Sequence, residues 1–497
     1  MNERRVLLAS LLSVIAISLY SQALPRRMTA PSKPMVQAAD QTTAHEPRKQ
    51  QAATIGAFVD EETVSLESPE LVVAIGRSSG AVRRLTLKGF LNERKTAPLE
   101  FSGEIPLVAV VGLEGESDKQ VSTQGSSATV LVGARDGSQR TIEYAVHPIK
   151  PILTVSVGEP TPIVLTWQKG DSLSHGQNRL EAFAWELIGD NKAKHRHFGG
   201  PWKTEKNVPR GTFLLALADR YFCAVAKPDN KQAQVILVPS SDETIAATIV
   251  ASSLEIYAGP RDYFHLKANG YEQAFPIGMF GQLGLALLWF LGLLANLTKN
   301  YGVAIILFSI AVTILTAPFS LLGFRSMRRM QALKPQVDRI MAQHKGDQQK
   351  ANREVFALYK EHKISPLGGC LPMLLQMPIF IALFQAISHY INLRGARFWR
   401  ISDLSLPDSL IKLPAQMPLI GSSINVLPII MALAMYAQSR ASQVSMGSAE
   451  SNPTAKMLSG PLMPVMFLVM FYQFPAGLVL YWLTNSLMSM AFYRMAK

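Results

Sequence analysis

The sequence predicts a polytopic α-helical membrane core with an N-terminal anchor, joined to an exported antiparallel β-sandwich domain. Of its 497 residues, 48% are hydrophobic, and several long apolar runs carry no charge. Residues 55–265 instead contain short β-branched runs separated by Gly, Pro, Asn and Asp, with 22 Lys and Arg against 25 Asp and Glu. Residues 266–497 hold 20 Lys and Arg against 8 Asp and Glu. This surplus indicates the positive charge of cytoplasmic loops rather than nucleic-acid binding.

The first 54 residues predict an export signal followed by a linker. Arg4 and Arg5 precede an apolar run, so residues 1–24 are expected to form a signal anchor with a cytoplasmic N-terminus. A cleaved signal is the alternative, because Ser21-Gln22-Ala23 resembles a weak cleavage site. Residues 25–54 are rich in Pro, Gln and Ala without an apolar period, which is typical of a disordered linker.

The β-branched runs of residues 55–265 predict a single antiparallel β-sandwich. His195 and His197 could share one face of a strand, but no third metal ligand can be assigned, so a solvated loop is favoured. Cys223 and Cys370 fall in an exported domain and a membrane helix, which excludes a disulfide between them. We expect no catalytic residue, metal or cofactor.

An apolar segment with Phe280 and Trp289 follows, and residues 271–299 are expected to form an interfacial amphipathic helix. A true span is the alternative. The break Thr298-Lys299-Asn300 leaves little room for two crossing helices, which favours the interfacial position.

The segment Tyr301–Leu322 is the clearest predicted span, because its 22 uncharged residues would extend about 33 Å as a helix. Four hydroxyl residues recur along it at helical spacing and would form one stripe: Ser309, Thr313, Thr316 and Ser320. The stripe either faces other helices or water, or consists of hydroxyls that each bond the carbonyl one turn back.

Residues 323–363 predict a cytoplasmic helical hairpin. They carry ten Lys and Arg against four Asp and Glu, with apolar residues every three or four positions. Gly346-Asp347 is expected to end one helix with a C-cap glycine and begin the next with an N-cap aspartate. Pro335 is expected to kink the first helix.

Four further spans are predicted in the remainder of residues 300–497. They are Ser365–Tyr390, Pro418–Tyr436, Leu458–Phe474 and Leu478–Phe492, the last two joined by the turn Pro475-Ala476-Gly477. Residues 391–417 form an outside loop in this scheme. With Tyr301–Leu322 these make a five-helix core, and with the anchor the chain has six spans and both ends inside.

Three segments resemble the YidC family of membrane protein insertases: MQALKPQV at 330–337, KISPLGGCLPMLLQMPIFIALF at 363–384 and FPAGLVLYWLTNSL at 474–487. The resemblance implies an insertase and chaperone of the inner membrane with a periplasmic β-domain. It also implies a five-helix insertase core whose groove opens to cytoplasm and lipid, and no covalent chemistry. Nascent membrane proteins, the lipid bilayer, the Sec translocon and the ribosome or signal recognition particle machinery are the partners it implies.

The resemblance also assigns residues to roles. The substrate groove would include Ser309, Thr313, Thr316, Gln376, Trp482, Thr484 and Asn485. Independently of the resemblance, the methionines of the predicted spans either pack as ordinary apolar residues or form an adaptable surface along which substrate helices slide: Met373, Met377, Met463, Met466 and Met470. Contact with the ribosome would rest on Arg325, Arg328, Arg329, Lys334 and Arg339. Thr313 stands where most relatives place an arginine, so attraction of acidic substrates by a buried charge is in doubt, and hydration alone is the alternative.

Two other functions compete with this interpretation. A transporter or channel would show related halves and charged residues at mid-membrane, and the spans show neither. A membrane-anchored carbohydrate enzyme would need paired carboxylates in the β-domain. It would also leave the five core helices without a role.

Overall fold

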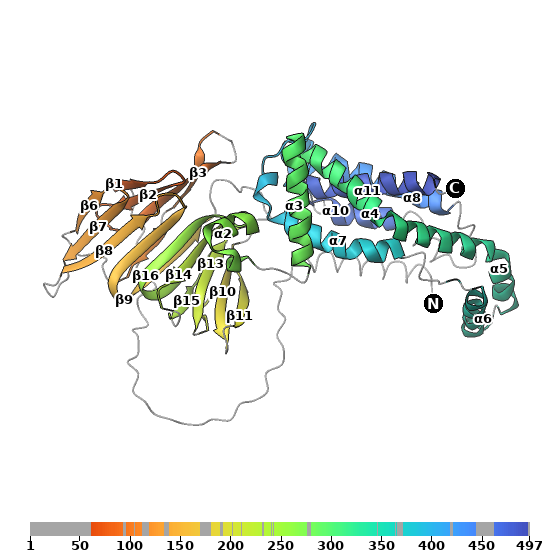
Figure 1. Ribbon diagram of the computed structural model, residues 1–497, viewed down its shortest axis with the longest axis horizontal. Helices are drawn as coiled ribbons and strands as arrows, with labels where there is room; N and C mark the ends of the chain where they lie inside the picture. The colour runs from red at the N-terminus through yellow and green to blue at the C-terminus, as the bar shows by residue number, and fades with distance from the viewer. Residues whose placement is uncertain are drawn as a thin grey trace, which may run out of the picture. The chain divides into compact units, whose positions relative to one another are not determined.

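The computed structural model describes residues 61–495, apart from 112–118, 169–179, 365–370, 444–461 and gaps of one to five residues elsewhere. The signal anchor and linker predicted for residues 1–54 lie outside the described residues. The described chain divides into two compact units after residue 276, an all-β unit and a helical unit (Figure 1).

The first unit is built on one antiparallel sheet, in which 16 strands are described. The strands are β1 (Thr63–Glu67), β2 (Leu71–Gly76), β3 (Val82–Leu91), β4 (Pro98–Ser102), β5 (Val108–Val110), β6 (Lys119–Gln124), β7 (Ser127–Gly133), β8 (Gln139–Val146), β9 (Ile152–Gln168), β10 (Glu181–Ile188), β11 (Lys192–Gly199), β12 (Lys206–Asn207), β13 (Thr212–Ala218), β14 (Phe222–Pro228), β15 (Val235–Val238) and β16 (Thr244–Pro260). The main path runs β1-β2-β3-β5-β9-β16-β14-β13-β10-β11.

The sheet folds over to form the predicted sandwich. β9 and β16 pair along nearly their whole length, with a register shift between Ala251 and Ser253. Phe90 of β3 and Phe222 of β14 contact edge to face at 5.5 Å, although three strands separate β3 from β14 in the sheet. Phe101 of β4 lies between Phe222 and Trp167 of β9, at 5.8 and 4.5 Å. These aromatic rings therefore join the two layers.

The segment around His195 and His197 is a strand, and the predicted solvated loop was wrong. It forms β11, the last strand of the main path, paired with β10. His197 stacks on Phe183 of β10 at 4.7 Å, and His195 lies 6.4 Å from Trp185. The strand is exposed and polar because it lies at the sheet edge, which explains why its sequence resembles a loop. No group of three potential metal ligands occurs among the residues described.

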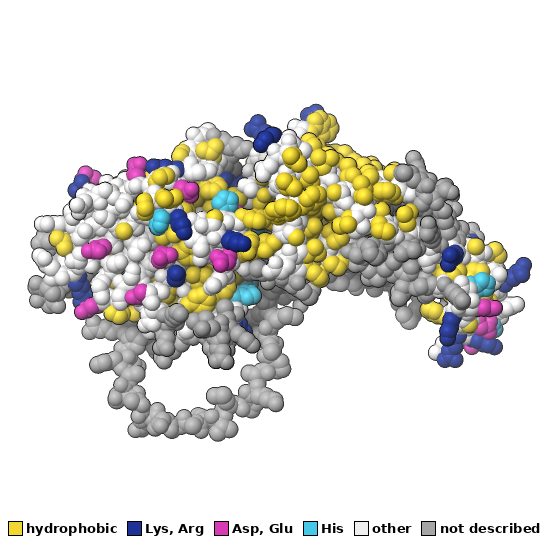
Figure 2. Space-filling model, in the orientation of Figure 1, with side chains coloured by type: hydrophobic (Ala, Val, Ile, Leu, Met, Phe, Trp, Pro, Cys, Tyr) yellow, Lys and Arg dark blue, Asp and Glu magenta, His cyan; other side chains and the backbone are white. Residues whose placement is uncertain are grey.

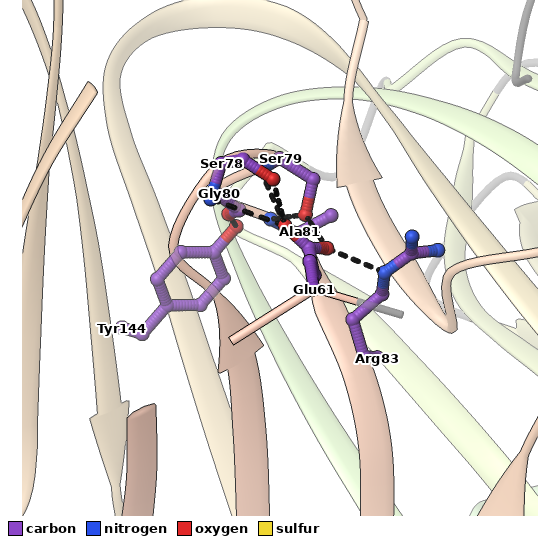
Figure 3. A network of polar contacts seen from close by, with 7 residues as sticks. All are labelled: Glu61, Ser78, Ser79, Gly80, Ala81, Arg83 and Tyr144. Carbon is purple, nitrogen blue, oxygen red and sulfur yellow. Dashed lines mark hydrogen bonds and ion pairs between the residues drawn. The ribbon is translucent and has the colours of Figure 1, made fainter. Parts of the chain in front are cut away.

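A polar network fixes the start of the sheet (Figure 3). The Glu61 carboxylate accepts hydrogen bonds from both the backbone N–H and the hydroxyl of Ser78 and Ser79. It also pairs with Arg83 Nε at 2.6 Å. A Cβ at Gly76 would lie 2.0 Å from Glu61 Oε1, so any larger residue there would displace the Glu61 carboxylate. Glu61 thus holds the segment before β1 against the β2–β3 turn.

The β unit ends later than the sequence suggested. Helix α2 (Tyr263–Asn269) and the 3-10 turn η1 (Glu272–Ala274) belong to it, and Tyr271 and Ala274 are buried with β-unit residues. The next helix, α3 (Gly281–Thr298), begins ten residues after the predicted start at residue 271. Among the described helices, α3 and Tyr301–Pro318 of the next helix are long and apolar enough to span a membrane. The spanning alternative for α3 therefore stands beside the interfacial one.

The first core span and the hairpin share one helix. α4 (Tyr301–Ala332) continues ten residues past Leu322. The helix is interrupted at Leu333, which is the N-cap of α5 (Lys334–Gln343). Pro335 lies in the first turn of α5, where its missing N–H costs nothing, so the predicted kink is instead a helix start. α6 (Gln348–Glu361) begins as predicted, because Asp347 accepts from the N–H of Lys350. The C-cap of α5 is His344 rather than Gly346.

The remaining helices are α7 (Leu371–Ser388), α8 (Val426–Gln443), α10 (Leu462–Phe471) and α11 (Ala476–Met495). The predicted third span, Pro418–Tyr436, started too early, because Gly421–Ile424 form strand β18, which pairs antiparallel with β17 (Ile411–Met417). Asp408 Oδ2 accepts from the N–H groups of Val426 and Leu427 and so fixes the start of α8.

Candidate functional site

The hydroxyl stripe of α4 is bonded within its own helix. Ser309 Oγ donates to the Ile305 carbonyl at 2.6 Å, and Thr313 Oγ1 donates to the Ser309 carbonyl at 2.7 Å. Thr316 Oγ1 donates to the Val312 carbonyl at 2.9 Å. Of the two alternatives for the stripe, the local one accounts for the donors of these three hydroxyls. Each hydroxyl oxygen keeps lone pairs that could still accept a hydrogen bond.

The exposure of the stripe changes along the helix. Ser309 is fully buried and Thr313 is 6% exposed. Thr316 and Ser320, nearer the hairpin, are partly exposed. The stripe is therefore closed towards the N-terminal end of α4 and accessible towards its hairpin end.

A hydrogen bond joins α7 to α11 beside this stripe. Gln376 Nε2 of α7 donates to Tyr481 Oη of α11 at 2.5 Å. Tyr481 is fully buried, and its ring lies 6.0 Å from that of Phe308, the neighbour of Ser309. Sequence reasoning missed Tyr481. The available signal was a tyrosine inside an apolar run, since a buried phenol needs a partner for its hydroxyl.

The predicted groove residues of α11 differ in their surroundings. Trp482 lies in an aromatic cluster, 5.1 Å from Phe380, 5.2 Å from Phe467 and 5.2 Å from Phe471. Thr484 Oγ1 donates to the Leu480 carbonyl at 2.9 Å, as the hydroxyls of α4 do in their helix. Asn485 accepts from Ser489 Oγ at 3.3 Å and is partly exposed.

The helices that carry these groups pack together, since α11 contacts α4, α7 and α8, and α4 contacts α7. We call the shared polar groups the polar belt, comprising Ser309, Thr313, Thr316, Gln376, Tyr481, Thr484 and Asn485. Every described side chain of the belt is uncharged. Such a belt can exchange hydrogen bonds with water or a polypeptide.

The segment between α7 and α8 covers the end of the core at which α4 begins. Leu393 and Leu404 are fully buried in the core of the helical unit. The N–H groups of Ala476 and Gly477, at the start of α11, donate to the carbonyls of Leu406 and Leu404 at 2.8 and 2.9 Å. A Cβ at Gly477 would lie 3.2 Å from the Leu404 carbonyl oxygen, so this close approach favours glycine. The belt is sealed at this end.

The candidate slide methionines whose side chains are described differ in exposure. Met377 and Met470 are exposed, whereas Met463 and Met466 pack against the core of the helical unit. The side chain of Met373 lies outside the described residues.

The basic hairpin is well exposed. Arg329 and Arg339 are exposed, and Lys334 pairs with Asp338 at 3.7 Å. The side chains of Arg325 and Arg328 lie outside the part that is described. Figure 2 shows charged side chains gathered at α5 and α6, in contrast to the hydrophobic surface over α3 and α4.

Comparisons with known proteins find relatives of this chain. Residues 293–496 match the family model described as 60Kd inner membrane protein. The chain is 40% identical over 464 residues to the membrane protein insertase YidC of Endomicrobium trichonymphae, covering 87% of this chain and 84% of the relative. It is 36% identical over 309 residues to the YidC of Geotalea daltonii, covering 59% of this chain and 54% of that relative. A crystal structure of an active YidC insertase aligns with 89% of this chain and 95% of its own at 18% identity, with a TM-score of 0.39.

Proposed function

Because the chain belongs to the YidC family of membrane protein insertases, we propose that it moves hydrophobic segments of new proteins from the cytoplasm into the inner membrane. The polar belt receives the hydrophilic part of an incoming segment, while its apolar part enters lipid along the helix surfaces. The observation that carries the proposal is the belt itself, which is buried beside the sealed end of the core and accessible towards the hairpin.

The energetic argument concerns the polar part of the substrate. Each backbone or side-chain group that enters hydrocarbon without a partner costs about 2–7 kcal/mol. A hydrated recess that reaches part-way across the bilayer shortens the dry path and so lowers this barrier. The belt can hold water there because its hydroxyl, amide and phenol oxygens remain available as acceptors.

The belt works without a charge. Thr313 occupies the position where an arginine was expected, and its hydroxyl already donates to Ser309. The remaining lone pairs accept hydrogen bonds from water, backbone N–H groups or substrate hydroxyls. They give no electrostatic preference for carboxylates, so the groove is hydration-driven and tolerant of substrate charge.

The finer parts of the proposal concern orientation and partners. The hairpin lies in the cytoplasm, where its exposed Arg329 and Arg339 contact the ribosome or the targeting machinery. The β unit lies in the periplasm. Met377 and Met470 contact substrate helices as they leave the belt, with the protein acting alone or beside the Sec translocon.

Reconstitution tests the proposal most directly. Purified protein in liposomes is expected to speed the insertion of a small single- or double-spanning protein without ATP. The matched control is the same protein with Thr313→Leu, which fills the sealed part of the belt with an apolar side chain. Equal insertion in protein-containing and empty liposomes would refute the insertase activity.

A further inference from the structure

A tight turn in the segment between α7 and α8 displays a tryptophan. The backbones of Phe398 and Ile401 exchange two hydrogen bonds, of 3.0 and 2.9 Å, which leaves Trp399 and Arg400 at the tip. Trp399 is 87% exposed, and its φ of 50° lies in the left-handed region. A bulky side chain rarely adopts that conformation, which glycine or asparagine would favour. Trp399 therefore costs free energy through its backbone conformation and through the exposure of its ring to water. These costs point to a role in binding.

The turn is fixed to the helical core rather than mobile on it. The Phe398 ring lies against Gly302 at the start of α4, so closely that a Cβ there would be 2.1 Å from the ring. The Leu404 N–H donates to the Ala396 carbonyl at 3.0 Å, and Asn300 Nδ2 donates to the Arg397 carbonyl at 3.4 Å. Trp399 is thereby held beside the first turn of the span.

The surroundings match one kind of partner. The apolar surface of α3 and α4 extends to this end of the unit, where Leu297 is 73% exposed and Val303 is also exposed (Figure 2). The side chains of Arg397 and Arg400 are exposed, and neither pairs with a carboxylate in the part of the chain that is described. An aromatic side chain between two arginines thus stands at the edge of a surface that faces lipid.

We propose that the turn Arg397–Arg400 anchors the core in the headgroup region of the outer leaflet, with a preference for anionic phospholipid. Tryptophan is favoured at the membrane interface because its ring is apolar and its N–H is polar. The arginines bind lipid phosphates through charge-assisted hydrogen bonds. The anchor fixes the depth of the sealed end of the core. It depends on the core spanning the membrane and not on insertase activity.

Tryptophan fluorescence tests the anchor in the full-length protein in vesicles. The emission of Trp399 is obtained by subtracting the emission spectrum of Trp399→Phe from that of the unchanged protein. We expect this emission to be quenched by phospholipids brominated near the glycerol and to be shielded from aqueous iodide. The matched comparison is Trp289→Phe, because Trp289 is 63% exposed along α3 and reports the depth of that helix under the same conditions. Quenching of Trp399 by iodide, without quenching by any brominated lipid, would overturn the proposal.

The arginines are tested with Arg397→Gln combined with Arg400→Gln. In vesicles that contain phosphatidylglycerol, this variant should lose part of the lipid quenching of Trp399. In phosphatidylcholine vesicles, quenching should be unchanged. Equal quenching of the variant and the unchanged protein in both vesicles would overturn the anionic preference. The control for misfolding is that the variant and the unchanged protein unfold at the same temperature. If Trp399 is shielded from iodide only after a second protein is added, the turn is a protein docking site and the lipid anchor is overturned.

Discussion

The hydrogen bond between Gln376 and Tyr481 offers the sharpest test of how the polar belt is held together. Tyr481→Phe removes the hydroxyl to which the Gln376 amide donates at 2.5 Å, and it leaves that amide among packed helices. An unmatched buried polar group costs about 1–3 kcal/mol. Interhelical hydrogen bonds in membranes contribute about 0.6 kcal/mol on average and about 1.7 kcal/mol at most. Since Gln376 is only partly buried, we expect a destabilisation of about 1 kcal/mol.

The double-mutant cycle isolates this bond. The four proteins are the unchanged chain, Gln376→Leu, Tyr481→Phe and the double variant, and the measurement is the free energy of unfolding in detergent or bicelles. Once the amide is gone, Tyr481→Phe no longer breaks the bond to residue 376 and removes only the contact of the phenol with Asn485, so the double variant should be less destabilised than the two single changes added together. We expect a coupling of about 0.6–1.7 kcal/mol. A coupling indistinguishable from zero would show that the bond does not hold α7 to α11, and the belt would have to be explained by apolar packing alone.

Three other predictions concern different parts of the chain. Hydrogen bonds from Ser78, Ser79 and Arg83 outweigh burial and lower the pKa of Glu61 from 4.5 to about 2. The ionised Glu61 therefore stabilises the β unit above pH 4.5, and this stabilisation is lost as the pH falls towards 2. In urea unfolding, Glu61→Gln should have a lower free energy of unfolding than the unchanged protein at neutral pH and the same free energy near pH 2. In the liposome insertion assay, Thr313→Arg should preserve or broaden activity while Thr313→Leu reduces it, and indifference to both would remove this position from the mechanism. Deletion of residues 61–275 should leave basal insertion largely intact, measured beside a folding control on the isolated core; complete loss with a folded core would give the β unit an essential role.

Sequence reasoning located the two units because their patterns differ over long distances. The 22 uncharged residues from Tyr301 indicate a helix surrounded by lipid, and the β-branched runs of 55–265 indicate strands that bury one face in a core. Such patterns of burial predict the fold class. Boundaries were less predictable. Only short runs of β9 (Leu153–Val157 and Ile163–Trp167) and of β16 (Ile245–Val250) were expected, whereas the two strands pair with each other across the register shift between Ala251 and Ser253. The start of α8 could not be predicted because Asp408, 18 residues earlier, provides its cap.

The candidate site was predictable in composition but not in arrangement. Spacing along α4 correctly placed Ser309, Thr313 and Thr316 on one face, and the same residues bond their own helix. Tyr481 was missed because its importance depends on Gln376, which lies 105 positions away in the sequence. No local pattern records a partner at that separation.

The length of α4 has a mechanical consequence. One uninterrupted helix of 32 residues joins the start of the membrane core to the exposed hairpin, a distance of about 48 Å. Pro318 removes one backbone hydrogen bond within it, so bending is expected to concentrate inside the stripe, between Thr316 and Ser320. If a partner binds the hairpin and moves it, we expect α4 to bend near the accessible end of the belt. The other end of α4, where Phe398 packs on Gly302, would stay in place.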